Sequence, residues 1–325
     1  MEASSFSLSV VVPVRNEVDG IEELADRLQT VLESTRAEWE VLLVDDGSTD
    51  GTYAACVALY GRDPRFKVIR LSRSFGHQVA LSSGLDLARG DAVITMDGDL
   101  QHPPEVIPEL VRHWRDGAQV VYGVMTERAG ESGFKGASAR WFYRVLDRLA
   151  DIDVPAGAGD YRLVDRAALD AYLLMPEANR YLRGMFTWVG FEQIGVPYAS
   201  PARAWGSSKY SVTQMIRLAK DAIVGFSDRP LRLALNLGFA VSIASILFGL
   251  SAAISKLAGV FVVPGWSSIM VLVGVVGGVQ LIVLGIIGEY VGRIADEVRR
   301  RPLYIVRAAH GFDAPGRTEP LAPPH

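Results

Sequence analysis

The chain has 325 residues, a net charge of -4 and one cysteine, Cys56. This length can hold one large or two ordinary domains with a substantial core. The small net charge and the lack of a block of like charges argue against nucleic acid as the main partner. A single thiol allows no intrachain disulfide, which fits a reducing compartment. The first residues carry an acid where a signal peptide carries a base, so we expect no cleaved export signal.

Apolar runs and amphipathic segments alternate along the first third of the chain. Short β-branched runs predict strands, and apolar residues at helical spacing predict helices. The expected strands are Ser7 to Val14, Val41 to Val44, Phe66 to Arg70, Ala92 to Met96 and Gln119 to Tyr122. The expected helices are Gly20 to Leu32, Tyr53 to Tyr60, Gln78 to Ala88 and Val106 to Arg115. This alternation predicts an α/β fold with a mostly parallel sheet and helices on both faces.

Three polar clusters follow strands of this sheet: Arg15-Asn16-Glu17, Asp45-Asp46 and Asp97-Gly98-Asp99. In mostly parallel sheets, ligands bind beyond the carboxyl ends of the strands. Gly98 lets the backbone bring its two acidic neighbours together, which suits Mg2+ or Mn2+ holding phosphate oxygens. A polar turn is the alternative, because Asp-Gly is also a common turn pair. The shared edge of the sheet favours a site for a phosphate-bearing ligand.

The second half of the chain carries signals for a membrane. Residues 137 to 151 place arginines beside an apolar stripe, which fits packing on the sheet or a membrane-facing role. Residues 211 to 226 have a broad apolar face, and we expect a helix lying on the bilayer surface. Residues 233 to 254 and 269 to 287 are each apolar and long enough to span a bilayer. A hairpin buried in a soluble protein is the alternative.

Arginines flank the two apolar segments on their outer sides. Arg229 and Arg232 precede the first segment, and Arg293 and the run from residue 299 to 301 follow the second. By the positive-inside rule, both ends of the chain face the cytoplasm and the short connecting loop faces outward. The proline-rich, polar stretch from Gly311 onward is expected to be disordered.

Four motifs occur in an order that resembles a known family. They are Ser9 to Glu17 (SVVVPVRNE), Val44 to Thr52 (VDDGSTDGT), Asp97 to Pro104 (DGDLQHPP) and Gly159 to Arg162 (GDYR). Together they resemble family 2 glycosyltransferases of the GT-A fold. Within that family they are most similar to the polyprenyl-phosphate glycosyltransferases, such as bactoprenol glucosyltransferases and dolichol-phosphate mannose synthases. The resemblance includes both apolar segments.

The resemblance implies roles for individual residues. The implied nucleotide-sugar pocket is formed by Pro13, Arg15, Glu17, Asp45, Asp46, Asp97 and Gly98. The implied ligands of a Mg2+ or Mn2+ cofactor are Asp97, Asp99 and Gln101. The implied catalytic residues are Asp99, Asp160, Arg203 and Lys209, and the implied contacts of the acceptor phosphate are Arg128, Lys135 and Arg140. Two departures occur: Arg15 stands where the family usually has tyrosine, and no arginine lies near Met125 before Arg128.

The resemblance also implies a reaction and a location. The expected reaction is inverting transfer of a hexose from a nucleotide sugar, preferably UDP-glucose, to polyprenyl phosphate at the cytoplasmic face of the inner membrane. Mannose, N-acetylglucosamine and aminoarabinose donors also fit. Asp160 occupies the family's candidate base position, although an ionised phosphate needs positioning more than deprotonation, so an orienting role is preferred. A membrane module that binds the nucleotide sugar without turnover, a non-catalytic scaffold and a processive polysaccharide synthase are the rivals. The synthase's Gln-x-x-Arg-Trp segment does not occur in this sequence.

These inferences divide the chain into four parts. Residues 1–210 form the cytoplasmic GT-A catalytic domain, and residues 211–230 the interfacial helix. Residues 231–290 form the two transmembrane helices, and residues 291–325 a cytoplasmic tail with a disordered end. Glycines in the second span permit close helix packing, so a homo-oligomer, either dimer or tetramer, is expected.

Overall fold

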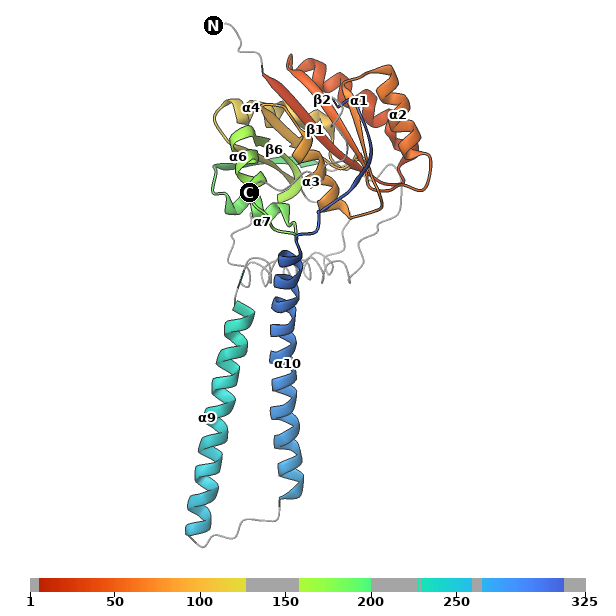
Figure 1. Ribbon diagram of the computed structural model, residues 1–325. Coiled ribbons are helices and arrows are strands. Elements are labelled where there is room, and N and C mark those ends of the chain that lie inside the picture. Colours follow the sequence, from red (N-terminus) through yellow and green to blue (C-terminus); the bar gives the residue numbers. More distant parts are fainter. Residues whose placement is uncertain (1–5, 127–157, 200–226, 228, 259–264, 313–325) are drawn as a thin grey trace.

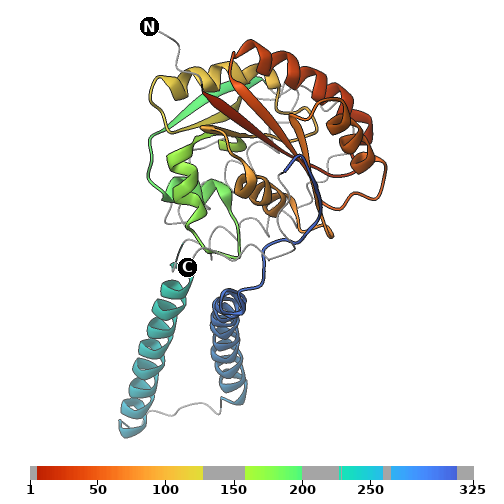
Figure 2. The same cartoon turned by 45° about the horizontal axis from the view of Figure 1, so that its top comes forward.

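The structure is a computed structural model that describes residues 6–126, 158–199, 227, 229–258 and 265–312. An α/β part carries the polar site, and two long helices extend away from it in both views (Figures 1 and 2). Several predictions concern segments outside the described residues. These segments are the helix expected within residues 137 to 151 and the interfacial helix expected within residues 211 to 226.

One eight-stranded sheet forms the centre of the α/β part, in the order β7-β5-β6-β4-β1-β2-β3-β8. Its first four strands are β1 (Ser7–Val14), β2 (Glu38–Asp45), β3 (Phe66–Leu71) and β4 (Ala92–Thr95), and all their mutual pairings are parallel. The others are β5 (Val120–Thr126), β6 (Ala158–Asp165), β7 (Gln193–Ala199) and β8 (Val306–His310). Strand β6 runs antiparallel to β4 and β5, and β8 runs antiparallel to β3. The predicted mostly parallel sheet is confirmed.

Helices cover both faces of the sheet, because successive strand residues point to opposite sides. In β1, Val10 and Val12 belong to one core cluster and Val11 to the other, and all three are fully buried. The first cluster includes α1 (Ile21–Ser34), α2 (Thr52–Arg62) and α4 (Ile107–Arg115). The second includes α3 (His77–Leu87), α6 (Arg166–Leu173) and α7 (Leu182–Trp188). Two short 3-10 helices, Val18–Gly20 and Pro104–Val106, precede α1 and α4.

The strands and helices expected up to residue 122 are all present, within a few residues of their predicted ends. Beyond that point the sequence did not predict β6, α6, α7 or β7. Strand β6 carries Asp160 and Arg162 within its eight residues, so no continuous apolar run marks it. The region that completes the site is therefore the region whose secondary structure was missed.

Two long apolar helices follow the sheet, α9 (Arg229–Leu257) and α10 (Trp266–Arg299). Their apolar segments, Leu231–Ser251 and Leu272–Arg299, are long enough to cross a membrane, and only 6% and 0% of an 18-residue window within each segment is buried by protein. Both helices overlap the predicted spans and are candidate membrane helices. Because protein does not cover them, neither is a core helix of the described structure.

The chain returns to the sheet after α10, as the blue segment in Figures 1 and 2 shows. Helix α10 continues past residue 290, where we expected a tail to begin, and β8 then pairs with the edge strand β3. The Tyr304 hydroxyl donates to Asp86 Oδ2 at 2.8 Å, and the Tyr53 hydroxyl lies 2.9 Å from His310 Nε2. The expected cytoplasmic tail thus contains a strand of the central sheet.

Candidate functional site

The loops after β1 and β2 are tied together at the carboxyl edge of the sheet. The Asn16 amide donates to Ser48 Oγ at 3.1 Å, and the Glu17 amide donates to Thr52 Oγ1 at 2.9 Å. The Asn16 side chain in turn accepts from the Thr49 amide at 2.9 Å. Asn16 takes a left-handed backbone conformation, with φ 53°, which asparagine tolerates better than most residues. The first predicted polar cluster is therefore hydrogen-bonded directly to the loop that follows the second cluster.

The third cluster packs against the first at Gly98. A Cβ atom at Gly98 would lie 2.6 Å from Glu17 Oε2 and 3.0 Å from Val14 Cγ1. A side chain at this position would require Glu17 Oε2 to move. The structure thus brings together Glu17 and Gly98, both predicted to line the nucleotide pocket. Pro13 is buried in β1 behind them, and Arg15 is exposed at the start of the loop.

Asp45 and Asp46 are both buried but have different partners. Asp45 Oδ1 accepts from the Ser48 amide at 3.0 Å, and its Oδ2 lies 3.4 Å from Arg70 Nε. The guanidinium of Arg70 also lies 4.2 Å from the centre of the Tyr53 ring. Asp45 therefore belongs to a cationic and aromatic group beside β3.

The Asp46 carboxylate orders the loop that leads into α3. It accepts from Ser74 Oγ and the Phe75 amide, each at 2.7 Å, and from the Gly76 amide at 3.1 Å. The loop passes close to Gly47, where a Cβ would lie 2.6 Å from the Ser74 nitrogen. Gly47 has φ +69°, which also favours glycine. Asp46 acts on the site through this loop.

His102 holds the start of the acidic loop after β4. The Asp97 amide donates to His102 Nδ1 at 2.9 Å, so this nitrogen carries no proton. Its 3.7 Å contact with Asp97 Oδ2 is therefore not an ion pair. The imidazole is buried and stacks on Tyr161, with ring centres 4.9 Å apart and planes inclined by 14°. His102 is a structural residue of the loop.

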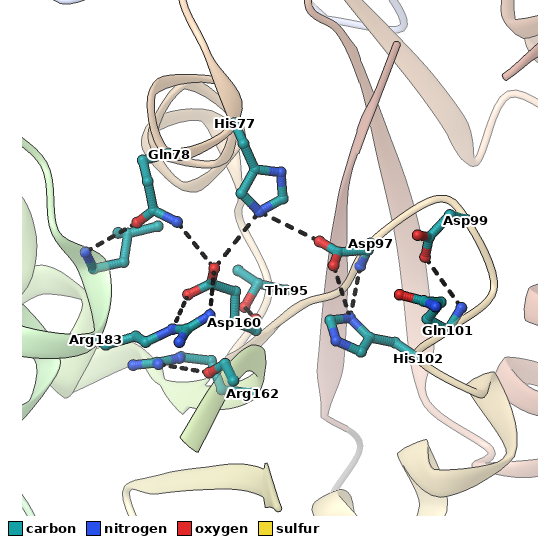
Figure 3. Close-up of polar contacts among 12 residues, drawn as sticks. His77, Gln78, Thr95, Asp97, Asp99, Gln101, His102, Asp160, Arg162 and Arg183 are labelled. Atoms are coloured by element: carbon teal, nitrogen blue, oxygen red, sulfur yellow. Dashed lines mark hydrogen bonds and ion pairs between the residues drawn. The ribbon is translucent and has the colours of Figure 1, made fainter. Parts of the chain in front are cut away.

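Asp97, Asp99 and Gln101 project from this loop (Figure 3). Asp99 Oδ1 accepts from the Gln101 amide at 3.1 Å, and Leu100 between them has φ 59°. Asp97 Oδ1 is shielded from solvent and has no hydrogen-bond partner among the described residues. His77 Nε2 lies 3.3 Å from this oxygen. An oxygen that loses hydration without gaining a hydrogen bond suits cationic neighbours, which include a bound metal ion.

The donor set fits a hard divalent cation. Carboxylate and amide oxygens are the ligands of Mg2+ and Mn2+, and such ions are commonly held by one or two carboxylates together with substrate phosphates. The described residues contain no group of three His, Cys, Asp or Glu side chains arranged around a metal position. A cation held by Asp97, Asp99 and Gln101 would thus share its coordination with a ligand.

Asp160, on β6, is the centre of a second polar group (Figure 3). Its carboxylate is 8% exposed and accepts from Arg183 Nε at 3.1 Å and from Arg183 Nη2 at 3.3 Å. Gln78 Nε2 donates to Oδ2 at 2.9 Å, and His77 Nε2 lies 3.6 Å from the same oxygen. Burial raises the pKa of Asp160, but Arg183 and His77 outweigh this and hold the pKa well below its ordinary range.

Arg162, also on β6, lies beneath this group. It is 2% exposed, and its Nη2 donates to the Gly159 carbonyl at 2.8 Å. Burial lowers the pKa of the Arg162 guanidinium to about 10. Its centre lies 5.1 Å from the centre of the Phe186 ring on α7. Arg162 remains a cation at neutral pH and adds a buried positive charge next to the Asp160 group.

Sequence reasoning missed Gln78 and Arg183 as members of the site and left His77 without a role. His77 and Gln78 open α3 at the same sheet edge as the acidic clusters, and this position was the available signal. Arg183 had no such signal because α7 was not predicted. The implied residues Arg128, Lys135, Arg140, Arg203 and Lys209 lie outside the described residues.

Comparisons with known proteins agree on one family. The model of glycosyl transferase family 2 matches residues 9–173. An uncharacterized glycosyltransferase of Bacillus subtilis, YkcC, is 42% identical over 305 residues and 94% of each chain. Bactoprenol glucosyl transferase of Shigella phage SfV is 37% identical over 93% of this chain and 98% of the relative.

A solved structure shows a weaker likeness. Glucosyl-3-phosphoglycerate synthase from Mycobacterium tuberculosis is 21% identical, with a TM-score of 0.49 over 67% of this chain and 76% of that chain. The sequence relatives, in contrast, extend through the sheet and both apolar helices. Since the family match spans residues 9–173 and the relatives align over nearly the whole length, the chain belongs to glycosyl transferase family 2.

Proposed function

We propose that this protein transfers a hexose from a nucleotide sugar, preferably UDP-glucose, to polyprenyl phosphate at the cytoplasmic face of the inner membrane, with inversion at the anomeric carbon. One observation carries this proposal. Asp97 and Asp160 lie at the same site, in a chain whose two apolar helices, α9 and α10, are not covered by protein. Near full-length similarity to bactoprenol glucosyl transferases supports the lipid acceptor and glucose.

The nucleotide sugar would occupy the edge formed by the loops after β1, β2 and β4. We assign Pro13, Arg15, Glu17, Asp45, Asp46, Asp97 and Gly98 to its pocket, with Asp46 acting through the Ser74-Phe75-Gly76 loop. Asp97, Asp99 and Gln101 would hold Mg2+ or Mn2+ on the diphosphate. The bound cation would supply positive charge that stabilises the departing nucleoside diphosphate.

The acceptor would enter on the side of Asp160. A phosphate is already ionised at neutral pH, so the nucleophile needs orientation more than a base. The low pKa of Asp160 makes its carboxylate a weak proton acceptor, and its two bonds to Arg183 favour a positioning role. We retain Arg128, Lys135 and Arg140 as proposed contacts of the acceptor phosphate. Arg203 and Lys209 are retained as proposed catalytic cations.

The membrane arrangement completes the proposal. Helices α9 and α10 would span the inner membrane, with the catalytic domain and both termini in the cytoplasm. The arginines at residues 229, 232, 293 and 299 to 301 support this orientation by the positive-inside rule. Residues 211–230 would lie on the bilayer surface and hold the site near the lipid phosphate. We also propose a homo-oligomer that packs through the glycines of α10.

The test is sugar transfer by the detergent-purified full-length protein. Undecaprenyl phosphate and Mn2+ are supplied with labelled UDP- or GDP-sugars in turn, and label extracted into organic solvent is counted. We expect a lipid-linked product from UDP-glucose that is lost with EDTA and in Asp99→Ala. Asp170→Asn, whose side chain is 61% exposed on α6, is the matched control and should keep full activity.

One result would change the proposed sugar, and another would contradict the proposed reaction. A product from another sugar donor would correct the proposed sugar and keep the reaction class. Tight donor binding without a product from any donor would instead favour a membrane module that binds nucleotide sugars without turnover.

A further inference from the structure

One ring nitrogen of His77 faces both acidic groups of the site (Figure 3). His77 Nε2 lies 3.3 Å from Asp97 Oδ1 and 3.6 Å from Asp160 Oδ2. Asp97 follows β4 on the metal side, and Asp160 lies on β6, so the imidazole bridges two strands. A single nitrogen carries at most one hydrogen and cannot donate fully to both carboxylates.

The two carboxylates depend on His77 to different degrees. Asp160 already accepts three hydrogen bonds, one from Gln78 and two from Arg183. Asp97 Oδ1 is shielded from solvent and has no hydrogen-bond partner among the described residues, although His77 forms an ion pair with it. The shorter contact and the lack of a hydrogen bond on Asp97 Oδ1 among the described residues make His77 the neighbour that most restricts this oxygen.

The position of His77 is fixed by the backbone that precedes it. Gly76, with φ +101°, turns the chain into the first residue of α3, a conformation that favours glycine. The Asp46 carboxylate holds the Ser74-Phe75-Gly76 loop with bonds from all three residues. His77 is therefore presented to Asp97 by a loop anchored on β2. The fold thus fixes a contact between the start of α3 and the loop after β4.

We propose that His77 is a positioning residue of the metal site, which holds the Asp97 carboxylate in one orientation and links it to Asp160 on the acceptor side. This inference rests on the proposed function, because it takes Asp97 as a ligand of the divalent cation. Hydrogen-bond partners that orient metal ligands commonly contribute about 10- to 100-fold to metal affinity or activity. His77 would act through Asp97, without touching the cation.

The test measures metal binding without turnover. Full-length protein in detergent is titrated with Mn2+ in the presence of UDP, and free Mn2+ is followed by electron paramagnetic resonance. His77→Ala should raise the Kd for Mn2+ by about 10- to 100-fold at unchanged Tm. His77→Gln should lose less affinity, because its amide nitrogen can still donate to Asp97. His113→Ala, which replaces a histidine on α4 outside the site, should bind as the wild type does.

The outcomes distinguish failure of the positioning role from failure of the proposed metal site. Unchanged or tighter Mn2+ binding by folded His77→Ala would overturn the positioning role and leave the proposed function standing. If the wild type itself binds no Mn2+ with UDP, the proposed metal site fails, and this inference fails with it. If His77→Ala does not fold, His77→Leu, which keeps the bulk but cannot donate a hydrogen bond, carries the same comparison, and wild-type Mn2+ affinity in that variant would overturn the role.

Discussion

Arg183 grips the Asp160 carboxylate with two hydrogen bonds, Nε to Oδ1 at 3.1 Å and Nη2 to Oδ2 at 3.3 Å. Such paired, charge-assisted bonds fix both the position and the plane of a carboxylate. They also stabilise its ionised form, so Asp160 holds a proton poorly at neutral pH. Under the proposed function, Asp160 would therefore position Arg183 and would not act as a base.

We expect Asp160→Asn to lower kcat by about 10- to 100-fold, the cost of one charge-assisted interaction of about 1.5–3 kcal/mol. The donor KM should change little. In a double-mutant cycle with Arg183→Gln, the two effects should be strongly non-additive, because each variant removes the same ion pair. Steady-state kinetics on the four proteins provide the measurement. Additive losses, or a kcat loss with a missing acid limb of the pH profile, would restore the base role.

Gly98 offers a second prediction, because a Cβ there would approach Glu17 Oε2 to 2.6 Å. Gly98→Ala must displace Glu17 or the acidic loop, so we expect UDP binding to weaken by at least about 10-fold, or 1.4 kcal/mol. Gly61→Ala in α2 is the matched control, since no atom lies within 4 Å of its added Cβ. That control should bind UDP normally and gain about 0.4–1 kcal/mol of stability. The UDP affinity of each variant is measured by calorimetric titration. Equal affinities of Gly98→Ala and the wild type would refute the expected steric conflict at Gly98.

Glu40 on β2 predicts a pH-dependent contribution to stability. Its carboxylate accepts from Lys67 Nζ at 2.7 Å, Ser9 Oγ at 2.6 Å and the Arg89 amide at 3.0 Å. Burial raises the pKa of Glu40, but these partners lower it more, so the net shift is downward. A lowered folded-state pKa stabilises the protein above the unfolded-state pKa, and this stabilisation is lost as the pH falls through the folded-state pKa.

We therefore expect Glu40→Gln to reduce the free energy of unfolding by about 1.5–3 kcal/mol at pH 7. The difference from wild type should shrink as the pH falls through the lowered folded-state pKa of Glu40, where the wild-type carboxyl also becomes protonated. Thermal unfolding in detergent across this range is the measurement. Glu38→Gln, exposed on the same strand, should stay close to wild type at each pH. A constant difference across the range would contradict the assignment.

Strand β8 predicts that the end of the chain stabilises the catalytic sheet. Deleting residues 304–325 removes β8 and the Tyr304 bond to Asp86, and it exposes β3 as an unpaired edge. We expect a Tm at least about 5 °C lower, since each kcal/mol moves Tm by about 2–4 °C in a domain of this size. Aggregation on size exclusion should increase. Deleting residues 313–325 is the control, and equal behaviour of the two deletions would refute a role for β8.

The local pattern of the sequence determined many of the strands and helices of this protein and the placement of its polar clusters. Runs such as Val10-Val11-Val12 and Val41 to Val44 are buried on both faces, and their apolar character announces buried parallel strands without any tertiary information. The two long apolar helices are likewise legible from length and composition. The acidic motif after β4 and the polar clusters after β1 and β2 could be placed at one edge because parallel strands share a direction.

Tertiary structure decided the partners of these groups. Asp160 and Arg183 are separated by an unpredicted helix. His77 opens α3 after β3 and meets Asp97 after β4, although β1 and β2 lie between β3 and β4 in the sheet order. No local period reports such contacts, since they depend on how distant elements pack. The return of β8 to β3 after two apolar helices is another long-range pairing, and five residues of moderate apolarity carried too little local signal to reveal it.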